Sequence, residues 1–214
     1  MASAALPASL ATPDPKVARI VRLAREHLFA HGYSPCTMDD LASELGMSKK
    51  TLYLHFPSKD ELMSAVIDQL GEEIRADAEA LLANRQLGFA EKLRGFAEGM
   101  AERMSRLHPR AIRDLQRFAP ELHQRVVEMR QRNIPYIFGR FIEEGQLAGR
   151  VRTDVDAGFA VEFYLQAMQG LFQSGALERL KLAPRDVAAR AIDLFFGGLL
   201  TPAGRKEHEK LFAH

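Results

Sequence analysis

The chain has 214 residues, of which 47% are hydrophobic and 27% are charged. This composition predicts a soluble globular protein with enough length for one large or two modest domains. The formal net charge of +1 argues against nonspecific coating of nucleic acid, and no apolar run approaches the ~18 residues that a membrane-spanning helix needs.

The first thirteen residues, MASAALPASLATP, are rich in Ala, Ser and Pro. They lack the positively charged start and the sustained apolar stretch of a secretory signal, so we expect a flexible N-terminal arm. The single cysteine, Cys36, excludes an intrachain disulfide framework and fits a reducing, cytoplasmic location.

The first helix is expected to begin after Asp14, a good N-cap that Pro15 follows, and to end at Gly32. Its apolar residues recur at helical spacing, at positions 17, 20, 21, 24 and 28. His27 and His31 lie four residues apart and could chelate a metal ion, but histidines near a helix C-terminus also interact with its dipole. Because no further ligand is evident, the sequence predicts neither a metal site nor a cofactor.

Residues 37–62 have the pattern of two short helices followed by the start of a third. Thr37 and Ser48 are N-cap residues, and Ser58 with Glu61 forms a capping box for the third helix. Gly46 lies between the two short helices, where a left-handed backbone ends the first. Two short helices joined by such a turn predict a helix-turn-helix, whose second helix enters the DNA major groove.

The exposed side of that second helix predicts its contacts with DNA. If Leu52 and Phe56 face the core, then Lys50 and Leu54 point outward. Thr51 and Tyr53 lie on the flanks of this outward side. The interpretation assigns base or phosphate contacts to Lys50, Thr51, Tyr53 and Leu54, and phosphate clamps at helix N-termini to Thr37, Ser48 and Lys59. Residues 1–62 carry seven Lys and Arg and seven Asp and Glu residues. Because this part of the chain has no net charge, the local arrangement of its lysines must attract DNA. The alternative to DNA binding is a small helical subdomain whose lysines are only solvated.

The run from Thr37 to Leu62, TMDDLASELGMSKKTLYLHFPSKDEL, closely resembles the signature of the tetracycline-repressor (TetR) family. That resemblance implies a bacterial one-component regulator, usually a homodimeric repressor that a small molecule releases from DNA. It also implies phosphate contacts at Thr37, Ser48, Tyr53, His55 and Lys59, and a recognition helix that starts with Lys49, Lys50 and Thr51. Lys50 and Leu54 depart from the residues that many members carry, so the operator sequence cannot be copied from a relative.

Downstream, helical periodicity predicts a long helix from Lys59 to about residue 83 and amphipathic helices over about 89–107, 112–118 and 121–144. Pro135 is expected to kink the last of these. The run Arg113 to Leu122 resembles a C-terminal domain common among repressors of efflux and stress genes. The predicted pocket for a small apolar effector uses Phe96, Met100, Met104, Phe118, His123, Tyr136, Phe141, Phe163, Tyr164 and Met168, although each is also a plausible core residue. No Arg or Lys stands out as isolated within an apolar stripe, so the sequence does not argue for an anionic ligand.

The helix expected after a Thr153–Asp156 capping box is apolar on nearly all sides, which predicts burial against a second subunit. Pro184 opens the last main helix, and Gly197-Gly198 is expected to close it before a frayed polar tail. Two helices from each subunit would form a four-helix dimer interface. Its predicted residues are Phe159, Ala160, Phe163, Ala167, Leu171, Val187, Ala191, Leu194 and Phe195.

Taken together, these patterns predict an all-α protein. Its predicted divisions are an arm (1–13), a helix-turn-helix domain (14–62), a helical effector-binding and dimerisation domain (63–200) and a polar tail (201–214). Its predicted function is that of a ligand-responsive homodimeric repressor of a palindromic operator, and the alternative is a helical protein–protein adaptor. The sequence lacks HExxH, Walker A, GxSxG and a GxGxxG after a strand, so we do not expect an enzyme.

Overall fold

The computed structural model describes residues 14–173 and 176–212; the predicted N-terminal arm lies outside this part of the chain. All regular elements of the described part are helices, and its only β-bridge is an isolated pair between Val151 and Leu200. The all-α prediction is therefore confirmed. Within the described ranges, no helix combines the length and apolar character that crossing a membrane requires.

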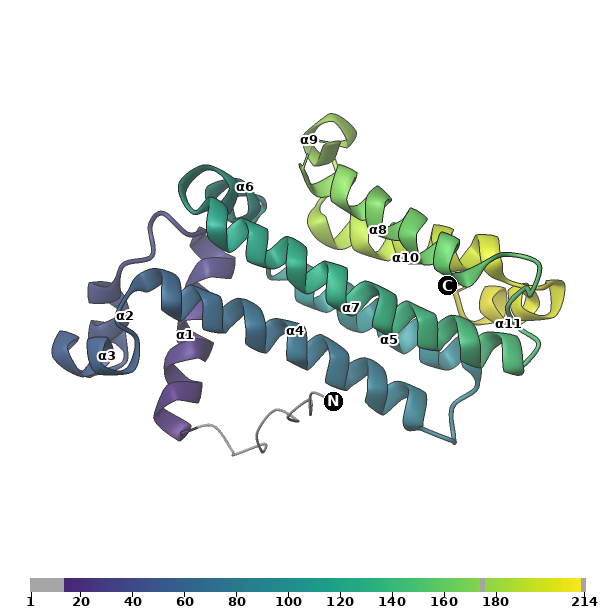
Figure 1. Ribbon diagram of the computed structural model, residues 1–214, viewed down its shortest axis with the longest axis horizontal. Coiled ribbons are helices and arrows are strands. Elements are labelled where there is room, and N and C mark those ends of the chain that lie inside the picture. The colour runs from purple at the N-terminus through teal and green to yellow at the C-terminus, as the bar shows by residue number, and fades with distance from the viewer. Residues whose placement is uncertain (1–13, 174–175, 213–214) are drawn as a thin grey trace, which may run out of the picture.

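The first three helices form one end of the molecule (Figure 1). They are α1 (Pro15–His31), α2 (Met38–Glu44) and α3 (Lys49–His55). α1 packs against both α2 and the start of the long helix α4, and α2 packs against α3. This arrangement is the helix-turn-helix that the sequence predicts.

The N-caps of these helices are the predicted ones. The Asp14 carboxylate accepts from Lys16 N–H at 2.9 Å, and the Thr37 hydroxyl oxygen accepts from the Asp40 N–H at 3.1 Å. Ser48 caps α3 in the same way. Gly46 has φ +65°, the left-handed backbone that the turn between α2 and α3 needs.

Two long helices, α4 (Lys59–Ala83) and α7 (Pro120–Leu147), run side by side from this end through the body of the molecule (Figure 1). Between them in the chain come α5 (Phe89–Ser105) and α6 (Pro109–Phe118). α7 continues as one helix across Pro135. Because α4 starts in the helix-turn-helix end and continues along the body, a movement of α4 would carry α1–α3 with it.

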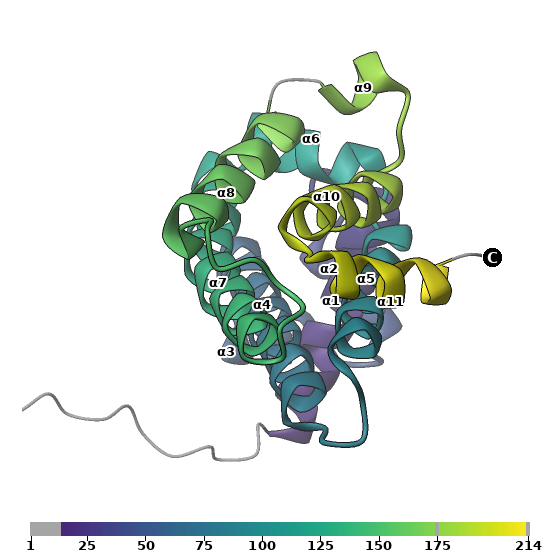
Figure 2. The same cartoon turned by 90° about the vertical axis from the view of Figure 1, so that its right-hand side faces the viewer.

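The remaining helices form a second layer on the body. They are α8 (Ala157–Gln173), α9 (Ala176–Leu180), α10 (Pro184–Leu199) and α11 (Pro202–Phe212). α8 packs along α7, whereas α10 packs along α5, and Figure 2 shows the two pairs side by side down the long axis.

Two apolar cores hold these layers together. One contains α1–α3 and extends to Met63, Val66 and Ile67 of α4 and to Leu115 of α6. The other joins α5, α7, α8 and α10 around an aromatic cluster. At its centre the Phe138 ring lies 4.5 Å from the Tyr164 ring, measured between centroids. The predicted division at residue 62 therefore falls within the first turn of a continuous helix and within one continuous core.

Three local expectations were wrong. α8 begins at Ala157, and its cap is Asp156, which accepts from the Phe159 N–H at 2.7 Å; the predicted Thr153–Asp156 box does not form the start. α10 continues through Gly197-Gly198 to Leu199.

The third concerns the polar tail, most of which is the helix α11, docked on α5. It is anchored by an ion pair between Arg150 and Glu207, 2.6 Å between Nη2 and Oε1, and by the buried ring of His208. Gly204 lets the helix approach the Arg150 carbonyl closely.

Candidate DNA interface and effector cavity

The outward side of α3 carries the predicted reading residues. Leu52 and Phe56 are buried in the core, with exposed fractions of 0% and 9%. The opposite side presents Lys50 and Leu54, and Leu54 is 75% exposed. Lys50 has no ion-pair or hydrogen-bond partner among the described residues. An unpaired lysine beside an exposed leucine, on a helix that protrudes from one end of the molecule, is suited to contact the edges of bases.

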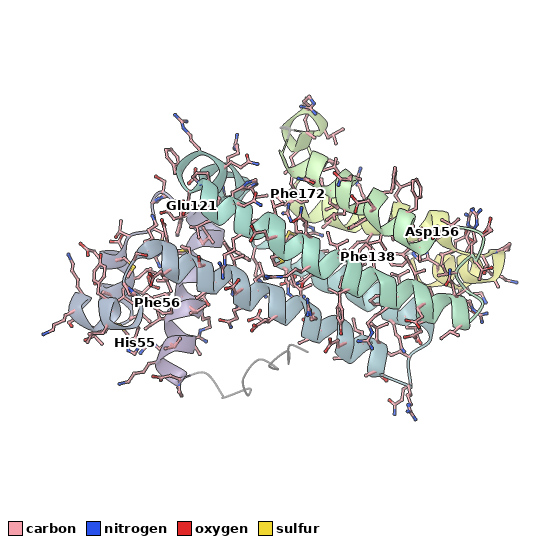
Figure 3. All side chains as sticks on the ribbon, viewed as in Figure 1. His55, Phe56, Glu121, Phe138, Asp156 and Phe172 are labelled. Atoms are coloured by element: carbon pink, nitrogen blue, oxygen red, sulfur yellow. The ribbon has the colours of Figure 1, made fainter. Side chains whose placement is uncertain are left out.

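Two of the other candidates, Lys49 and Thr51, are held by contacts within the domain. Lys49 forms an ion pair with Asp39 of α2, and Thr51 bonds the Ser48 hydroxyl at 2.9 Å. Tyr53 is exposed, and His55 is half-buried at the end of α3. Figure 3 shows His55 and Phe56 at the end of the molecule, far from Phe138 in the body.

Lys59 is half-buried at the start of α4, with Nζ 3.8 Å from the centroid of the Tyr33 ring. Burial lowers the pKa of Lys59 from its ordinary value, although Cys36, Asp60 and Asp114 oppose that shift. The Tyr33 hydroxyl donates to Asp60 at 2.5 Å, and burial together with this hydrogen bond raises the pKa of Tyr33 to about 12. Lys59 is therefore fixed in position beside the first turn of α4, where a DNA phosphate could meet both its charge and the free helix N–H groups.

Two further sequence features have structural roles nearby. His27 Nε2 lies 2.6 Å from Glu44 Oε2 and so ties α1 to α2. Cys36 is buried in the apolar core formed by α1–α3. Within the described part of the chain, no group of three or more His, Cys, Asp or Glu residues is placed to hold a metal ion.

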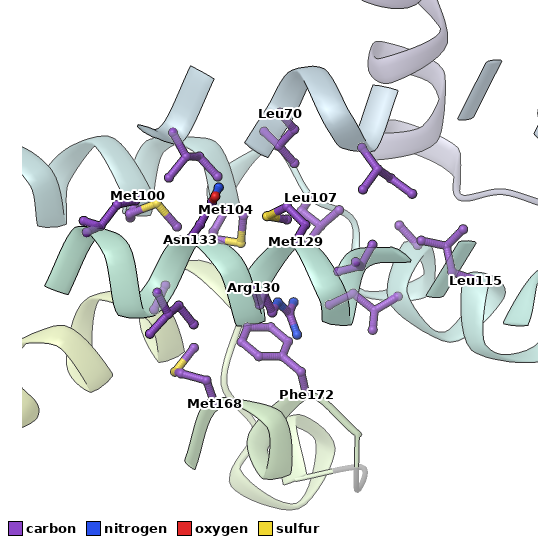
Figure 4. Close-up of a pocket in the computed structure, with 18 of the residues that line it drawn as sticks. Leu70, Met100, Met104, Leu107, Leu115, Met129, Arg130, Asn133, Met168 and Phe172 are labelled. Carbon is purple, nitrogen blue, oxygen red and sulfur yellow. The ribbon is translucent and has the colours of Figure 1, made fainter. Parts of the chain in front are cut away.

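A cavity of about 150 Å³ lies between α1, α4, α5, α6, α7, α8 and α10. Its wall is mostly aliphatic and methionine-rich, and Figure 4 shows Met100, Met104, Met129 and Met168 around it. An engineered cavity of about this volume in another protein admits benzene. Small apolar compounds, or parts of larger ones, therefore fit it without rearrangement.

Six of the ten predicted effector residues line this cavity: Phe96, Met100, Met104, His123, Tyr164 and Met168. The other four lie elsewhere. Phe118, Tyr136 and Phe163 are 52%, 37% and 64% exposed, and Phe141 is fully buried in the aromatic core. Helical periodicity groups residues by face, but it does not show which face of each helix meets the cavity.

The prediction missed lining residues from α1 and α4, such as Phe29 and Leu70, and two polar residues of α7, Arg130 and Asn133. The signal for Arg130 was present in the sequence. It follows Val126 by four residues and precedes Ile137 by seven, so it lies on the apolar stripe of α7. The expectation that no cation is isolated within an apolar stripe was therefore wrong.

The polar residues of the cavity differ in whether they already have partners. The Asn133 amide donates to the Gly71 carbonyl at 2.7 Å and accepts from Arg75 at 3.0 Å. His123 Nε2 lies 3.3 Å from the Gln116 amide nitrogen, and burial, helped by the charge of Arg130, lowers the pKa of His123. His123 is therefore neutral at pH 7.

Four of the nine predicted dimer residues are exposed, three on α8 and one on α10. Phe159, Phe163 and Leu194 are 69%, 64% and 80% exposed, and Ala167 is exposed as well. Leu171, Ala191 and Phe195 are half-buried. Ala160 and Val187 instead face the core of the subunit and are buried. We call the surface formed by Phe159, Phe163, Ala167 and Leu194 the α8–α10 face.

Residues 20–66 match the model of the family described as bacterial regulatory proteins, tetR family. An uncharacterized HTH-type transcriptional regulator of Bacillus subtilis (strain 168), YvaF, is 33% identical over 82 residues. The matched stretch covers 38% of this chain and 43% of YvaF, less than half of that relative.

Two solved structures share the fold over most of both chains. The regulatory protein TetR from Rhodobacter sphaeroides superposes with a TM-score of 0.65 at 18% identity, covering 88% of this chain and 100% of that one. The regulator FadR from Bacillus subtilis, in complex with stearoyl-CoA, gives 0.57 at 18% identity, covering 85% and 98%.

Proposed function

Since the chain belongs to the TetR family of transcriptional regulators, we propose that it is a homodimeric repressor that binds a palindromic operator and leaves it when a small molecule enters the cavity. The observation that carries this proposal is the outward side of α3, where unpaired Lys50 lies beside exposed Leu54 on a capped, well-buttressed helix. In this role the protein acts in the bacterial cytoplasm and carries out no chemical reaction.

The α8–α10 face supports a homodimer. Three large apolar side chains exposed on two neighbouring helices form the kind of patch that soluble proteins use for association. Pairing α8 and α10 with the same helices of a second subunit would bury these side chains in a four-helix interface. The two α3 helices would then lie roughly 34–40 Å apart, the spacing that matches successive major grooves on one side of the duplex.

The position of the cavity supports ligand control. It is bordered by Val66, Ile67 and Leu70 of α4 and by Phe29 of α1. The same end of α1 is joined to α6, because His108 N–H donates to the Phe29 carbonyl at 2.8 Å. A ligand that changes the tilt of α4 would therefore move the two helix-turn-helix units relative to each other.

The proposed function is tested by selecting bound fragments from random double-stranded DNA with the purified full-length protein at moderate salt. We expect a two-fold symmetric motif whose half-sites lie about one duplex turn apart. No enrichment from a folded dimer would contradict the proposal and favour a role in binding another protein.

Release from DNA by a ligand is tested by measuring the distance between the two helix-turn-helix domains of the dimer. A spin label on Ser43→Cys, at an exposed position of α2 in each subunit, reports the separation of the two helix-turn-helix domains. The native Cys36 is 1% exposed and resists labelling. We expect different distances in the operator complex and in the form released by a ligand. An unchanged distance would show that α4 does not transmit the signal.

A further inference from the structure

Arg130 is the one Lys or Arg residue among the described residues that line the mostly apolar cavity. Its side chain comes from α7 and lines the cavity. Its guanidinium carbon lies 4.5 Å from the centroid of the Phe172 ring (Figure 4). No Asp or Glu lines the cavity, and no carboxylate pairs with Arg130 within the described part of the chain. Burial lowers the pKa of Arg130 to about 10, so it stays charged at pH 7. Arg130 is half-buried, and a charge held largely away from water without an ionic partner is costly, which indicates a use for it.

The groups near Arg130 are hydrogen-bond donors or are already paired. Tyr164 is buried, its pKa is raised by that burial, and its hydroxyl has no hydrogen-bond partner among the described residues. It therefore remains a neutral phenol that can donate a hydrogen bond. Asn133 is committed to Gly71 and Arg75. The cavity thus offers the N–H donors of a planar guanidinium and a hydroxyl donor, which together match the oxygens of a carboxylate.

The rest of the cavity selects for hydrocarbon. Apart from Arg130, His123 and Asn133, the wall consists of aliphatic, methionine and aromatic side chains, including Met100, Met104 and Leu107. These side chains adapt to varied apolar shapes but cannot satisfy a second charged group. A volume of about 150 Å³ suits a molecule of about six to ten non-hydrogen atoms and leaves no room for a nucleotide.

We propose that the cavity takes a small monoanionic amphiphile, with its carboxylate on Arg130 and Tyr164 and its hydrocarbon part against the methionine-rich wall. This proposal rests on the proposed function only in treating the cavity as the effector site. Binding itself is independent of DNA and can be measured without an operator.

The test compares three probes of equal chain length on the DNA-free, full-length protein by titration calorimetry at pH 7. They are octanoate, octan-1-ol and octylamine, which share an eight-carbon chain and carry an anionic, a neutral and a cationic head group. We expect octanoate to bind ~10-fold or more tightly than octan-1-ol, and octylamine not to bind, because a charged hydrogen bond is worth more than a neutral one and like charges repel. Equal binding of octanoate and octan-1-ol, or no binding of octanoate at millimolar concentration, would overturn the proposal.

Variants assign the effect to Arg130. Arg130→Met keeps the apolar volume and removes the charge, so we expect the preference for octanoate to disappear while octan-1-ol still binds. Arg130→Lys should retain the preference in weaker form. The matched control is Arg132→Met, two residues along α7, where the side chain is exposed to solvent. Octanoate binding that is unchanged in a folded Arg130→Met protein, as judged by circular dichroism, would overturn the assignment. Operator binding that fails in the wild type while octanoate binds would count against the proposed function alone.

Discussion

At the residue scale, Lys50 and Lys59 differ in how firmly the protein holds them. Lys50 is exposed and unpaired on α3, whereas Lys59 is half-buried over the Tyr33 ring. A free lysine in the groove can donate to guanine, and a lysine fixed beside a helix N-terminus is placed for phosphate. The two positions therefore separate base recognition from backbone binding within one small domain.

We expect Lys50→Ala to lose about 1–3 kcal/mol of discrimination at one position of the operator half-site. Lys59→Ala should weaken all sequences alike and reduce the slope of log affinity against log salt by about one charge. Binding titrations on the selected operator and its single-base variants, at several salt concentrations, distinguish the two. Identical profiles for both variants would show that the side of α3 assigned to base contacts is wrong.

Arg130 shows what residue-level prediction from the sequence lacks. The spacing of Val126, Arg130 and Ile137 already places the arginine on the apolar stripe of α7. Long cationic side chains often lie along apolar surfaces with their charge in water, so the pattern alone does not predict an isolated charge. The missing information is tertiary: α8 covers this part of α7, and Phe172 lies against the guanidinium.

At the element scale, the helix starts were predictable because they depend on local chemistry. Asp14, Thr37, Ser48 and Ser58 each cap the helix that follows. α11 was not predicted, since its stability comes from contacts with residues about fifty positions away. Thr201 shows this, because its hydroxyl donates to the Gly149 carbonyl at 2.9 Å and accepts from the Gly204 N–H at 3.1 Å.

The docking of α11 predicts the effect of a matched pair of glycine substitutions. A Cβ at Gly204 would lie 2.3 Å from the Arg150 carbonyl oxygen, a backbone atom that cannot move aside cheaply. We expect Gly204→Ala to lower the free energy of unfolding by roughly 1–3 kcal/mol. A Cβ at Gly139 in α7 meets nothing within 4 Å, so Gly139→Ala should raise it by roughly 0.5–1 kcal/mol. Urea denaturation measures both, and equal stability of the two variants would contradict the docking of α11.

α11 also predicts a loss of stability on mild acidification. Burial lowers the pKa of His208 from its ordinary 6.5, although Asp193, 3.4 Å from Nε2, opposes the shift. Between the lowered value and 6.5 the unfolded chain binds more protons than the folded one, so stability falls as the pH drops through this window. His123 is shifted in the same direction and adds to the effect.

The measurement is Tm between pH 7 and pH 5. We expect His208→Gln to show a smaller decrease in Tm than the wild type over this range, because Gln does not titrate. The acidic groups with lowered pKa, such as Glu207, lose their contribution only at lower pH and leave this window unaffected. A decrease in Tm that is the same in His208→Gln would assign the acid sensitivity to other groups.

At the scale of the whole molecule, dimerisation determines whether the α3 helix is useful. One helix-turn-helix covers a single half-site, and two gain affinity and symmetry only if a rigid interface holds them at the spacing of the grooves. The α8–α10 face lies on the second layer of the body, whereas α3 lies at the end of the molecule (Figure 1). Contacts between the bodies of two subunits would therefore set the separation of two distant α3 helices.

The α8–α10 face can be tested with a pair of leucines of similar exposure. Leu194 on α10 is 80% exposed, and Leu147 at the end of α7 is 85% exposed. A glutamate at an exposed site has little effect on a monomer, but within an apolar interface it is a buried, unpaired charge. We therefore expect Leu194→Glu to be a folded monomer by sedimentation and to lose ~100-fold or more in operator affinity. Leu147→Glu should remain a dimer that binds the operator normally. If Leu194→Glu stayed dimeric, the subunits would associate through another surface, and the predicted spacing of the half-sites would have to be derived again from that surface.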